Sequence, residues 1–356
     1  MSLHPGPLFI QAMGFTHPWP LGAIWGQAMT KLIFSATTAL LLSTALAAGA
    51  DVAVKAPAAA PAAVAAPSPW DIAFGGAVMS DYNFRGISQS NRKPSVNAYF
   101  EPRYNVTPNI QLYAGVGGYS IEFPNNAAAE IDFYGGIRPT FDKLAFDFGV
   151  WYYYYPGGRT FTGFTGTAPN LFNPNPFCTN LFTGANGLCN AIKSDLSFIE
   201  LYGKATYTFN DNFAIGIAGY YDPDWLNSGA PGWYLSGNAK YTGTPFANGI
   251  GWYLSGELSH YWLGTTDAFY AFTPLPDYTT WNIGLGLTYK VFTVDFRYYD
   301  TDLSKAECNV LTGDHTAAFS PGFITPINGS GLGSKWCGAA FIVAGKVDLT
   351  LLANIK

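Results

Sequence analysis

The sequence predicts an all-β protein: a transmembrane antiparallel up-and-down β-barrel of about 12 strands, with short periplasmic turns and long external loops. The first observation is composition, because charged residues make up 12% of the chain and aromatic residues 17%, whereas a soluble protein carries about 25% charged residues. The second is that apolar residues alternate with polar ones instead of gathering in long runs. The third is that short and long connections alternate between these segments.

The one long apolar run lies at residues 32–46, directly after the basic residue Lys31. Small residues follow it, and an Ala-x-Ala pattern ends at Ala47 and again at Ala50. A basic residue, an apolar core and a small-residue cleavage site are typical of a secretory signal peptide. We therefore expect a cleaved signal peptide over residues 29–50, and a retained anchor helix is the alternative.

The flanking segments differ in composition from a folded domain. Residues 1–28 contain no charged side chain and several prolines, which indicates upstream sequence read from a misassigned start. Residues 51–68 are rich in alanine and proline, as in an extended tether, here placed in the periplasm. The barrel is predicted over residues 69–356. Without residues 1–50 the formal net charge changes from −5 to −6, because Lys31 is the only charged residue removed, so we expect no nucleic-acid partner.

Alternation with a period of two residues defines the predicted strands. Trp281, Ile283 and Leu285 fall on one face, and Asn282 lies between the first two on the other. A helix with 3.6 residues per turn does not produce this pattern. Each strand approaches or exceeds the roughly 9–11 residues that a tilted membrane strand needs. The predicted strands are residues 70–82, 95–105, 109–121, 130–141, 144–155, 195–209, 212–221, 233–241, 250–262, 278–289, 291–300 and 338–352.

The predicted connections alternate in length. The tight ones are Thr107-Pro108-Asn109, Asp142-Lys143, Asn210-Asp211-Asn212 and Lys290. The long ones lie near residues 83–94, 122–129, 156–194, 222–232, 263–277 and 301–337. Short periplasmic turns and long external loops are the asymmetry of an outer-membrane barrel, and an even strand number places both ends of the barrel on one side.

Aromatic residues are concentrated at the ends of the predicted strands. Those at the short-turn ends are Trp70, Tyr104, Phe209, Phe213, Tyr241, Trp252, Tyr289 and Phe292. Those at the loop ends are Tyr82, Tyr152, Tyr221, Trp233, Trp262, Trp281 and Tyr298. Two such girdles are expected where a barrel meets the two membrane interfaces. The alternative is that aromatic residues simply favour strands.

Two prolines fall inside predicted strands. Pro102 and Pro139 each remove one backbone donor from the sheet. Both lie near a tight turn, so we expect a bulge or an early strand end at these positions.

Strand parity places the charged side chains in the barrel interior. The acids are Asp71, Glu101, Asp132, Asp147, Glu200, Glu257, Asp295 and Asp348, and the bases are Arg103, Arg138, Lys204, Lys240, Arg297 and Lys346. A lysine or arginine facing lipid near the midplane costs roughly 2–4 kcal/mol. The confinement of the charged side chains to inward positions therefore supports a membrane barrel. Two interpretations remain open: a selectivity lining for a solute path, or an internal ion-pair network that fills the barrel.

The four cysteines lie in or beside the two longest loops. Exported proteins pass through an oxidising compartment, so we expect disulfides. Three pairings are formally possible, and we favour Cys178–Cys189 and Cys308–Cys337. A four-thiolate metal site is not expected, because the short spacings that such sites use are absent.

No catalytic constellation is evident in the sequence. Outside the N-terminal 50 residues the only histidines are His260 and His315. His260 is followed by Tyr261 and Trp262 rather than by the serine of a His-x-Ser dyad, and no nucleotide, zinc or hydrolase motif is present. We expect neither an enzyme nor a cofactor.

One motif follows the first predicted strand: Ser80-Asp81-Tyr82-Asn83-Phe84-Arg85-Gly86-Ile87-Ser88-Gln89-Ser90, with Pro94 after it. It resembles the opening motif of the TorF family of proteobacterial porins. Phe133-Tyr134-Gly135-Gly136 and the Tyr152–Tyr155 run are similar to this family as well. The resemblance covers residues 70–356 and implies an outer-membrane barrel with transport activity and no assigned substrate. Arg85 is expected either to order the first loop or to form part of the pore mouth.

Together these patterns predict a porin-like channel in the bacterial outer membrane. Twelve strands fall between barrels filled by side chains and barrels with a water-filled channel. We therefore expect a narrow charged lumen. The connection 156–194 is expected either to fold inward and constrict it or to form a surface lid. Membrane lipid and small hydrophilic solutes are the expected partners, and passive diffusion is the expected activity. The alternative is a closed structural or adhesive barrel that acts through its external loops.

Overall fold

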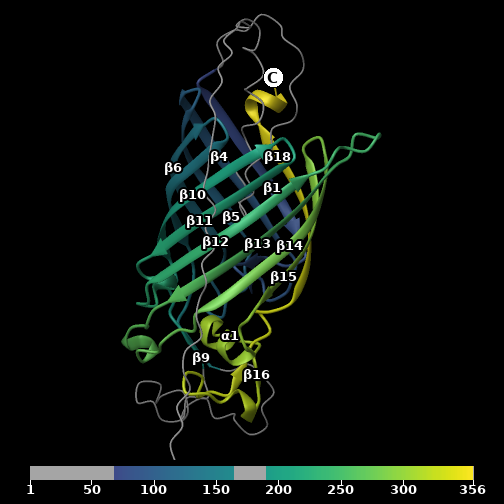
Figure 1. Ribbon diagram of the computed structural model, residues 1–356. Helices are drawn as coiled ribbons and strands as arrows, with labels where there is room; N and C mark the ends of the chain where they lie inside the picture. The colour runs from purple at the N-terminus through teal and green to yellow at the C-terminus, as the bar shows by residue number, and fades with distance from the viewer. Residues whose placement is uncertain (1–67, 164–189, 356) are drawn as a thin grey trace, which may run out of the picture. The chain divides into compact units, whose positions relative to one another are not determined.

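A computed structural model describes residues 68–163 and 190–355, and its main feature is a closed antiparallel barrel (Figure 1). The fold class predicted from the sequence is confirmed. The predicted signal peptide and most of the predicted tether lie outside the described residues. The barrel strands are β1 (Trp70–Met79), β4 (Ser95–Thr107), β5 (Ile110–Tyr119), β6 (Glu130–Phe141), β7 (Leu144–Tyr154), β10 (Phe198–Asn210), β11 (Phe213–Asp222), β12 (Gly232–Thr242), β13 (Gly251–Leu263), β14 (Tyr278–Tyr289), β15 (Phe292–Thr301) and β18 (Ala340–Thr350).

Each barrel strand pairs with the barrel strands before and after it in the chain, and β1 pairs with β18 to close the sheet. The closing register runs from Ala73 opposite Thr350 to Met79 opposite Ala344. A closed sheet leaves no edge strand whose backbone N–H and C=O groups lack partners. The predicted twelve strands are all present, with small shifts at their ends. β1 stops at Met79, and β10 begins only at Phe198.

Tight turns and long loops occupy opposite ends of the barrel, as the sequence predicts (Figure 1). Residues 108–109, 142–143, 211–212 and 290–291 form the tight turns, and residues 243–250 form a longer one that the sequence did not single out. In the part of the chain that the structure describes, the loop end carries three small sheets and most of the helices. These are β2 (Asn83–Phe84) with β3 (Ile87–Ser88), β8 (Phe161–Gly163) with β9 (Asn190–Ile192), β16 (Ala318–Phe319) with β17 (Leu332–Gly333), η2 (Trp225–Asn227), η3 (Ala268–Tyr270), α1 (Lys305–Thr312) and η4 (Pro321–Phe323).

The chain leaves β18 in a short π-helical turn, η5 (Leu351–Ile355), so the last predicted strand ends slightly earlier than expected. Among the described residues, no helix has the length and apolar character needed to cross a membrane.

The two faces of the barrel wall differ in the way the alternation predicts. On β14 the side chains of Ile283 and Leu285 are 54% and 41% exposed on the outer face. On the neighbouring strand β13, Glu257 is buried and lies opposite Asn282 in the register. The outer face is therefore apolar, whereas ionic and hydroxyl groups are turned away from it.

Exposed aromatic side chains form contacts near both ends of the strands. Trp70 and Tyr104 meet at the turn end, with ring centroids 4.8 Å apart, and Tyr221 and Trp233 meet at the loop end at 4.4 Å.

The assignment of Tyr82 was wrong. Tyr82 was expected in the loop-end girdle, but it is 1% exposed and donates a hydrogen bond to a buried carboxylate. The reason is that β1 ends at Met79, so strand parity no longer governs Tyr82.

Both prolines lie within continuing strands, so an early strand end was the wrong expectation. β4 extends beyond Pro102 to Thr107, and β6 extends beyond Pro139 to Phe141. The register irregularity between β4 and β5 falls at Asn105 and Thr107, closer to the turn than Pro102.

The face assignment predicts unequal effects for two arginine substitutions on β14. Leu285→Arg places a charge on the apolar outer face near the strand centre and should reduce the free energy of folding into lipid by roughly 2–4 kcal/mol. Asn282→Arg serves as the matched control, because its cross-strand neighbour is Glu257. Urea titration of protein refolded into vesicles, read by the heat-dependent band shift of a folded barrel, measures both. Equal destabilisation would contradict the face assignment.

Candidate functional site

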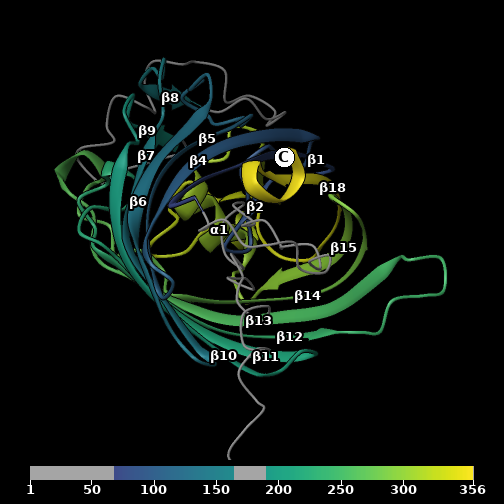
Figure 2. The same cartoon turned by 90° about the horizontal axis from the view of Figure 1, so that it is seen from above.

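The first long loop folds into the barrel instead of over it. Its β2–β3 segment, here called the Arg85 hairpin (residues 83–88), turns through Arg85 and Gly86 with φ of 49° and 85°. Two central residues with positive φ make a type I′-like turn, for which asparagine and glycine are the usual residues. Asn83 Oδ1 accepts a hydrogen bond from the Gly86 N–H at 2.9 Å. Seen along the barrel, β2 lies within the ring of strands (Figure 2).

Arg85 reaches the wall opposite β1. Its Nη1 and Nη2 donate to the two Glu200 carboxylate oxygens at 2.6 and 3.0 Å, and both side chains are fully buried. The Tyr278 hydroxyl donates to the Arg85 carbonyl at 3.1 Å. The loop between β1 and β4 is therefore attached to β10 and β14 across the lumen. Among the described residues this hairpin narrows the lumen. A constricting role for the connection 156–194 stays a prediction, because residues 164–189 lie outside the described part.

Aromatic rings surround the Arg85 guanidinium. Its central carbon lies 4.2 Å from the ring centroid of Tyr234, 4.7 Å from that of Tyr220 and 5.0 Å from that of Tyr261. A desolvated cation over such rings gains about 2 kcal/mol or more. We call Glu200 and these three tyrosines the Arg85 cage; all four stand on consecutive strands, β10 to β13.

Further carboxylates lie buried on the same half of the barrel. Glu130 accepts hydrogen bonds from Tyr82 at 2.5 Å and from Tyr155 at 2.8 Å. Asp222 accepts from Tyr261 at 2.6 Å, Glu257 accepts from Tyr234 at 2.9 Å, and Asp132 is 2% exposed. Within the described part of the chain, none of these four carboxylates has an ion pair with a lysine or arginine. The loop half of the lumen is therefore acidic, with Arg85 as its paired cation.

A second cluster lies toward the turn end. Arg138 donates to Glu101 at 2.8 Å and to Asp147 at 3.3 Å, and Arg103 donates to Glu101 at 2.5 Å. The Tyr113 hydroxyl donates to Asp147. We call these residues the Arg138 cluster. Its two arginines balance its two carboxylates, whereas the four carboxylates of the loop half have no such partners among the described residues.

A third group lies on β15 and the neighbouring strands. Arg297 bonds to Asp295 at 2.9 Å and to Asn282 at 2.7 Å, and Tyr253 donates to Asp295 at 2.6 Å. Lys240 lies 4.3 Å from the Tyr253 ring centroid.

The other predicted lumen residues are more scattered. Lys204 lies 4.6 Å from the Tyr202 ring centroid, and Asp348, which shares β18 with Lys346, accepts from Tyr99 at 2.9 Å. Asp71 accepts from the Leu352 N–H at 3.0 Å and so caps the C-terminal turn rather than joining a cluster. A role for all fourteen residues in lining a solute path stays a prediction.

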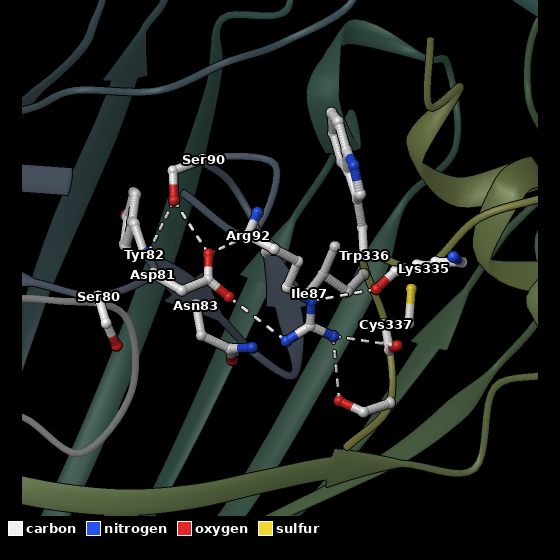
Figure 3. A network of polar contacts seen from close by, with 12 residues as sticks. Ser80, Asp81, Tyr82, Asn83, Ile87, Ser90, Arg92, Lys335, Trp336 and Cys337 are labelled. Carbon is white, nitrogen blue, oxygen red and sulfur yellow. Dashed lines mark hydrogen bonds and ion pairs between the residues drawn. The ribbon is translucent and has the colours of Figure 1, made fainter. Parts of the chain in front are cut away.

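The external loops are held together by Arg92 (Figure 3). Its guanidinium pairs with Asp81 at 3.3 Å and donates to the carbonyl oxygens of Lys335, Cys337 and Gly338 at 3.0, 3.1 and 3.2 Å. Burial raises the pKa of Asp81, although hydrogen bonds from Ser88 and the charge of Arg92 act in the opposite direction. The first loop is thus attached to the last one, at a distance of more than 200 residues in sequence.

The predicted disulfide Cys308–Cys337 is present, and it joins α1 to the segment that leads into β18. The second predicted pair, Cys178 and Cys189, lies outside the described residues.

A cavity of about 430 Å³ lies between the Arg85 hairpin and the external loops. Phe84 and Ile87 of the hairpin line it together with Trp225, Tyr278 and Trp336. Its wall mixes these aromatic side chains with aliphatic and polar ones, and it lies on the loop side of the Arg85 cage.

Sequence reasoning missed the inward tyrosines, which supply most hydroxyl partners of the buried carboxylates. The signal was present, since Tyr202 lies between Glu200 and Lys204 at the same parity, and Tyr261 follows Glu257 in the same way. Of the two described histidines, His260 contacts the Thr279 hydroxyl through Nδ1 at 3.0 Å, and His315 lies 3.6 Å from Glu122. Among the described residues, no three His, Cys, Asp or Glu side chains are grouped as metal ligands.

A model of a family described as bacterial protein of unknown function (Gcw_chp) matches residues 63–168, which include the Ser80–Ser90 motif. Membership of the TorF family stays a prediction. No curated protein matches the chain.

Similar solved structures are outer-membrane barrels of low identity. An outer membrane channel from Pseudomonas putida F1 is 10% identical, with a TM-score of 0.41 over 80% of this chain and 97% of that one. The NanC porin is 9% identical, with a TM-score of 0.38 over 79% and 100%. OmpT of Vibrio cholerae is 12% identical, with a TM-score of 0.33 over 81% and 100%.

We predict that the stability of the barrel depends strongly on the Arg138 side chain, which bonds to both carboxylates of the Arg138 cluster. Arg138→Met should lower the free energy of unfolding by roughly 3–5 kcal/mol, because it leaves Glu101 and Asp147 buried with reduced compensation. Lys93→Met is the control, since its ion pair with Glu122 is exposed and contributes only about 0–1 kcal/mol. Urea titration in detergent micelles measures both variants. A loss below 1 kcal/mol for Arg138→Met would show that the cluster is not a stabilising network.

Proposed function

We propose that this protein is an outer-membrane channel through which small hydrophilic solutes diffuse passively, and that the described conformation is its closed state. The observation that carries the proposal is a continuous column of polar side chains inside the barrel. It runs from the Arg138 cluster through the Tyr113 and Tyr202 hydroxyls, which contact each other, and Lys204 to the ring of Tyr220 in the Arg85 cage.

The outer face supports the location in a membrane. Leu, Ile, Val and Phe side chains are widely exposed there, with aromatic residues gathered toward both strand ends. A water-soluble barrel would leave this surface unburied, at a cost of about 25 cal/mol for each Å². A bilayer removes that cost, and the aromatic ends fit its two interfaces. The signal peptide over residues 29–50 would supply the export route.

The lumen favours a channel over a filled structural core because its charges are unequally compensated. A network that serves only to fill a barrel is most stable when every ionic group has a partner. The Arg138 cluster meets this condition, whereas Glu130, Asp132, Asp222 and Glu257 share the loop half with one paired arginine. Uncompensated carboxylates in a narrow path attract cations and repel anions.

A closed structural or adhesive barrel is the second candidate. The observation that favours it is the attachment of the first loop to the opposite wall and to the last loop. If these attachments are permanent, the external loops rather than the lumen carry the activity.

Planar-bilayer recording tests the channel. We expect small conductance steps with a preference for K⁺ over Cl⁻, and Glu257→Gln should reduce that preference because the carboxylate lies in the acidic half of the lumen. Asp211→Asn, in an exposed tight turn, is the control and should leave selectivity unchanged.

The reversal potential under a KCl gradient reports the preference directly. Absence of any conductance from a correctly folded barrel, including one without the Arg85 side chain, would reject the channel and favour the closed barrel.

A further inference from the structure

We propose that the Arg85 cage is a binding site for guanidinium-bearing solutes, and that Arg85 is a tethered occupant of that site. The inference rests on the proposed channel function for its physiological meaning. The binding site itself follows from the geometry of the cage and can be tested without conduction.

The cage has the features that recognise a guanidinium rather than a simple cation. Glu200 offers both carboxylate oxygens to two N–H groups of Arg85, at 2.6 and 3.0 Å, in the forked geometry that a planar guanidinium matches. Tyr220, Tyr234 and Tyr261 present ring faces within 5.0 Å of its central carbon. An ammonium ion would make the charge interaction but not the paired hydrogen bonds.

The cage belongs to the barrel wall and not to the hairpin that fills it. Glu200 lies on β10, and the three tyrosines lie on β11, β12 and β13. Each is held by contacts inside the wall: Glu200 accepts from Tyr153 at 2.9 Å, and Tyr261 donates to Asp222 at 2.6 Å. Withdrawal of the hairpin would therefore leave the cage assembled and empty of its cation.

Arg85 does not use all the hydrogen-bonding capacity around it. Its own Nε has no hydrogen-bond partner, and neither do Asp222 Oδ1 and Glu257 Oε2, all three of them buried. Glu257 and Asp222 each bond to a tyrosine of the cage through the other oxygen. A free solute, which carries no backbone, could place its remaining N–H groups toward these oxygens.

The hairpin is held by far less sheet pairing than a barrel strand. Its two strands contain two residues each, and Arg85 adopts φ of 49° where glycine or asparagine is preferred. A non-glycine residue is strained in this region. Such strain persists where the surrounding structure holds the residue in place. At position 85 the contacts of the guanidinium with the cage do so.

Chemical rescue tests the proposal. Arg85→Ala, refolded in detergent, should bind methylguanidinium, which would raise its Tm by about 2–4 °C at a concentration about ten times Kd. Urea at equal concentration is the neutral control of the same shape and should give no shift. Arg85→Ala/Glu200→Gln should lose the methylguanidinium response, because the fork is removed.

In bilayers, Arg85→Ala should conduct more than the wild type, and methylguanidinium should block it while urea and Na⁺ do not. A Tm response without conductance would retain the binding site and reject the channel. Conductance without any methylguanidinium-specific effect on Tm or current would overturn the binding site and leave the channel standing. If Arg85→Ala does not refold, Arg85→Gly, which also empties the cage and suits the φ of 49° at this position, takes its place with the same expected responses.

Discussion

Everything in this structure depends on the two-residue repeat of a β-strand within a closed sheet. Closure gives the backbone N–H and C=O groups of every strand a hydrogen-bond partner. Along each strand the side chains point alternately outward and inward, so a register slip of one residue would exchange the two sets. Leu285 points outward and Glu257 points inward. This arrangement is stable only where lipid covers the outer face and polar groups fill the interior of the barrel. The ion pairs, the inward tyrosines and the position of the Arg85 hairpin all follow from that division.

The interior is not uniform along the barrel. At the turn end, the Arg138 cluster pairs each buried acid with an arginine, as a stabilising network requires. In the loop half of the lumen, several carboxylates without an ion pair to a described residue lie near the pair of Arg85 with Glu200. This contrast connects the proposed transport to the proposed guanidinium site, because the half that holds these carboxylates is also the half that the Arg85 hairpin occupies.

The sequence predicted the barrel well because strand parity is a local property, visible in residues such as Trp281, Ile283 and Leu285. It also indicated Cys308–Cys337, since the two residues flank one loop. It did not indicate where the first loop would go. Arg85 and Glu200 are 115 residues apart, and nothing near either residue shows that they meet. Tyr82 was misplaced for a related reason, because parity gives no guidance beyond the end of β1.

The division of the two faces can be measured most directly by a nitroxide scan along β14, with the refolded protein in lipid vesicles. Labels at single cysteines placed from residue 279 to residue 288 report collisions with oxygen, which concentrates in the bilayer, and with a water-soluble nickel complex. We predict an oxygen accessibility that oscillates with a period of two residues and is greatest at positions 281, 283 and 285. A flat profile, or a maximum at the even-numbered positions, would contradict the account.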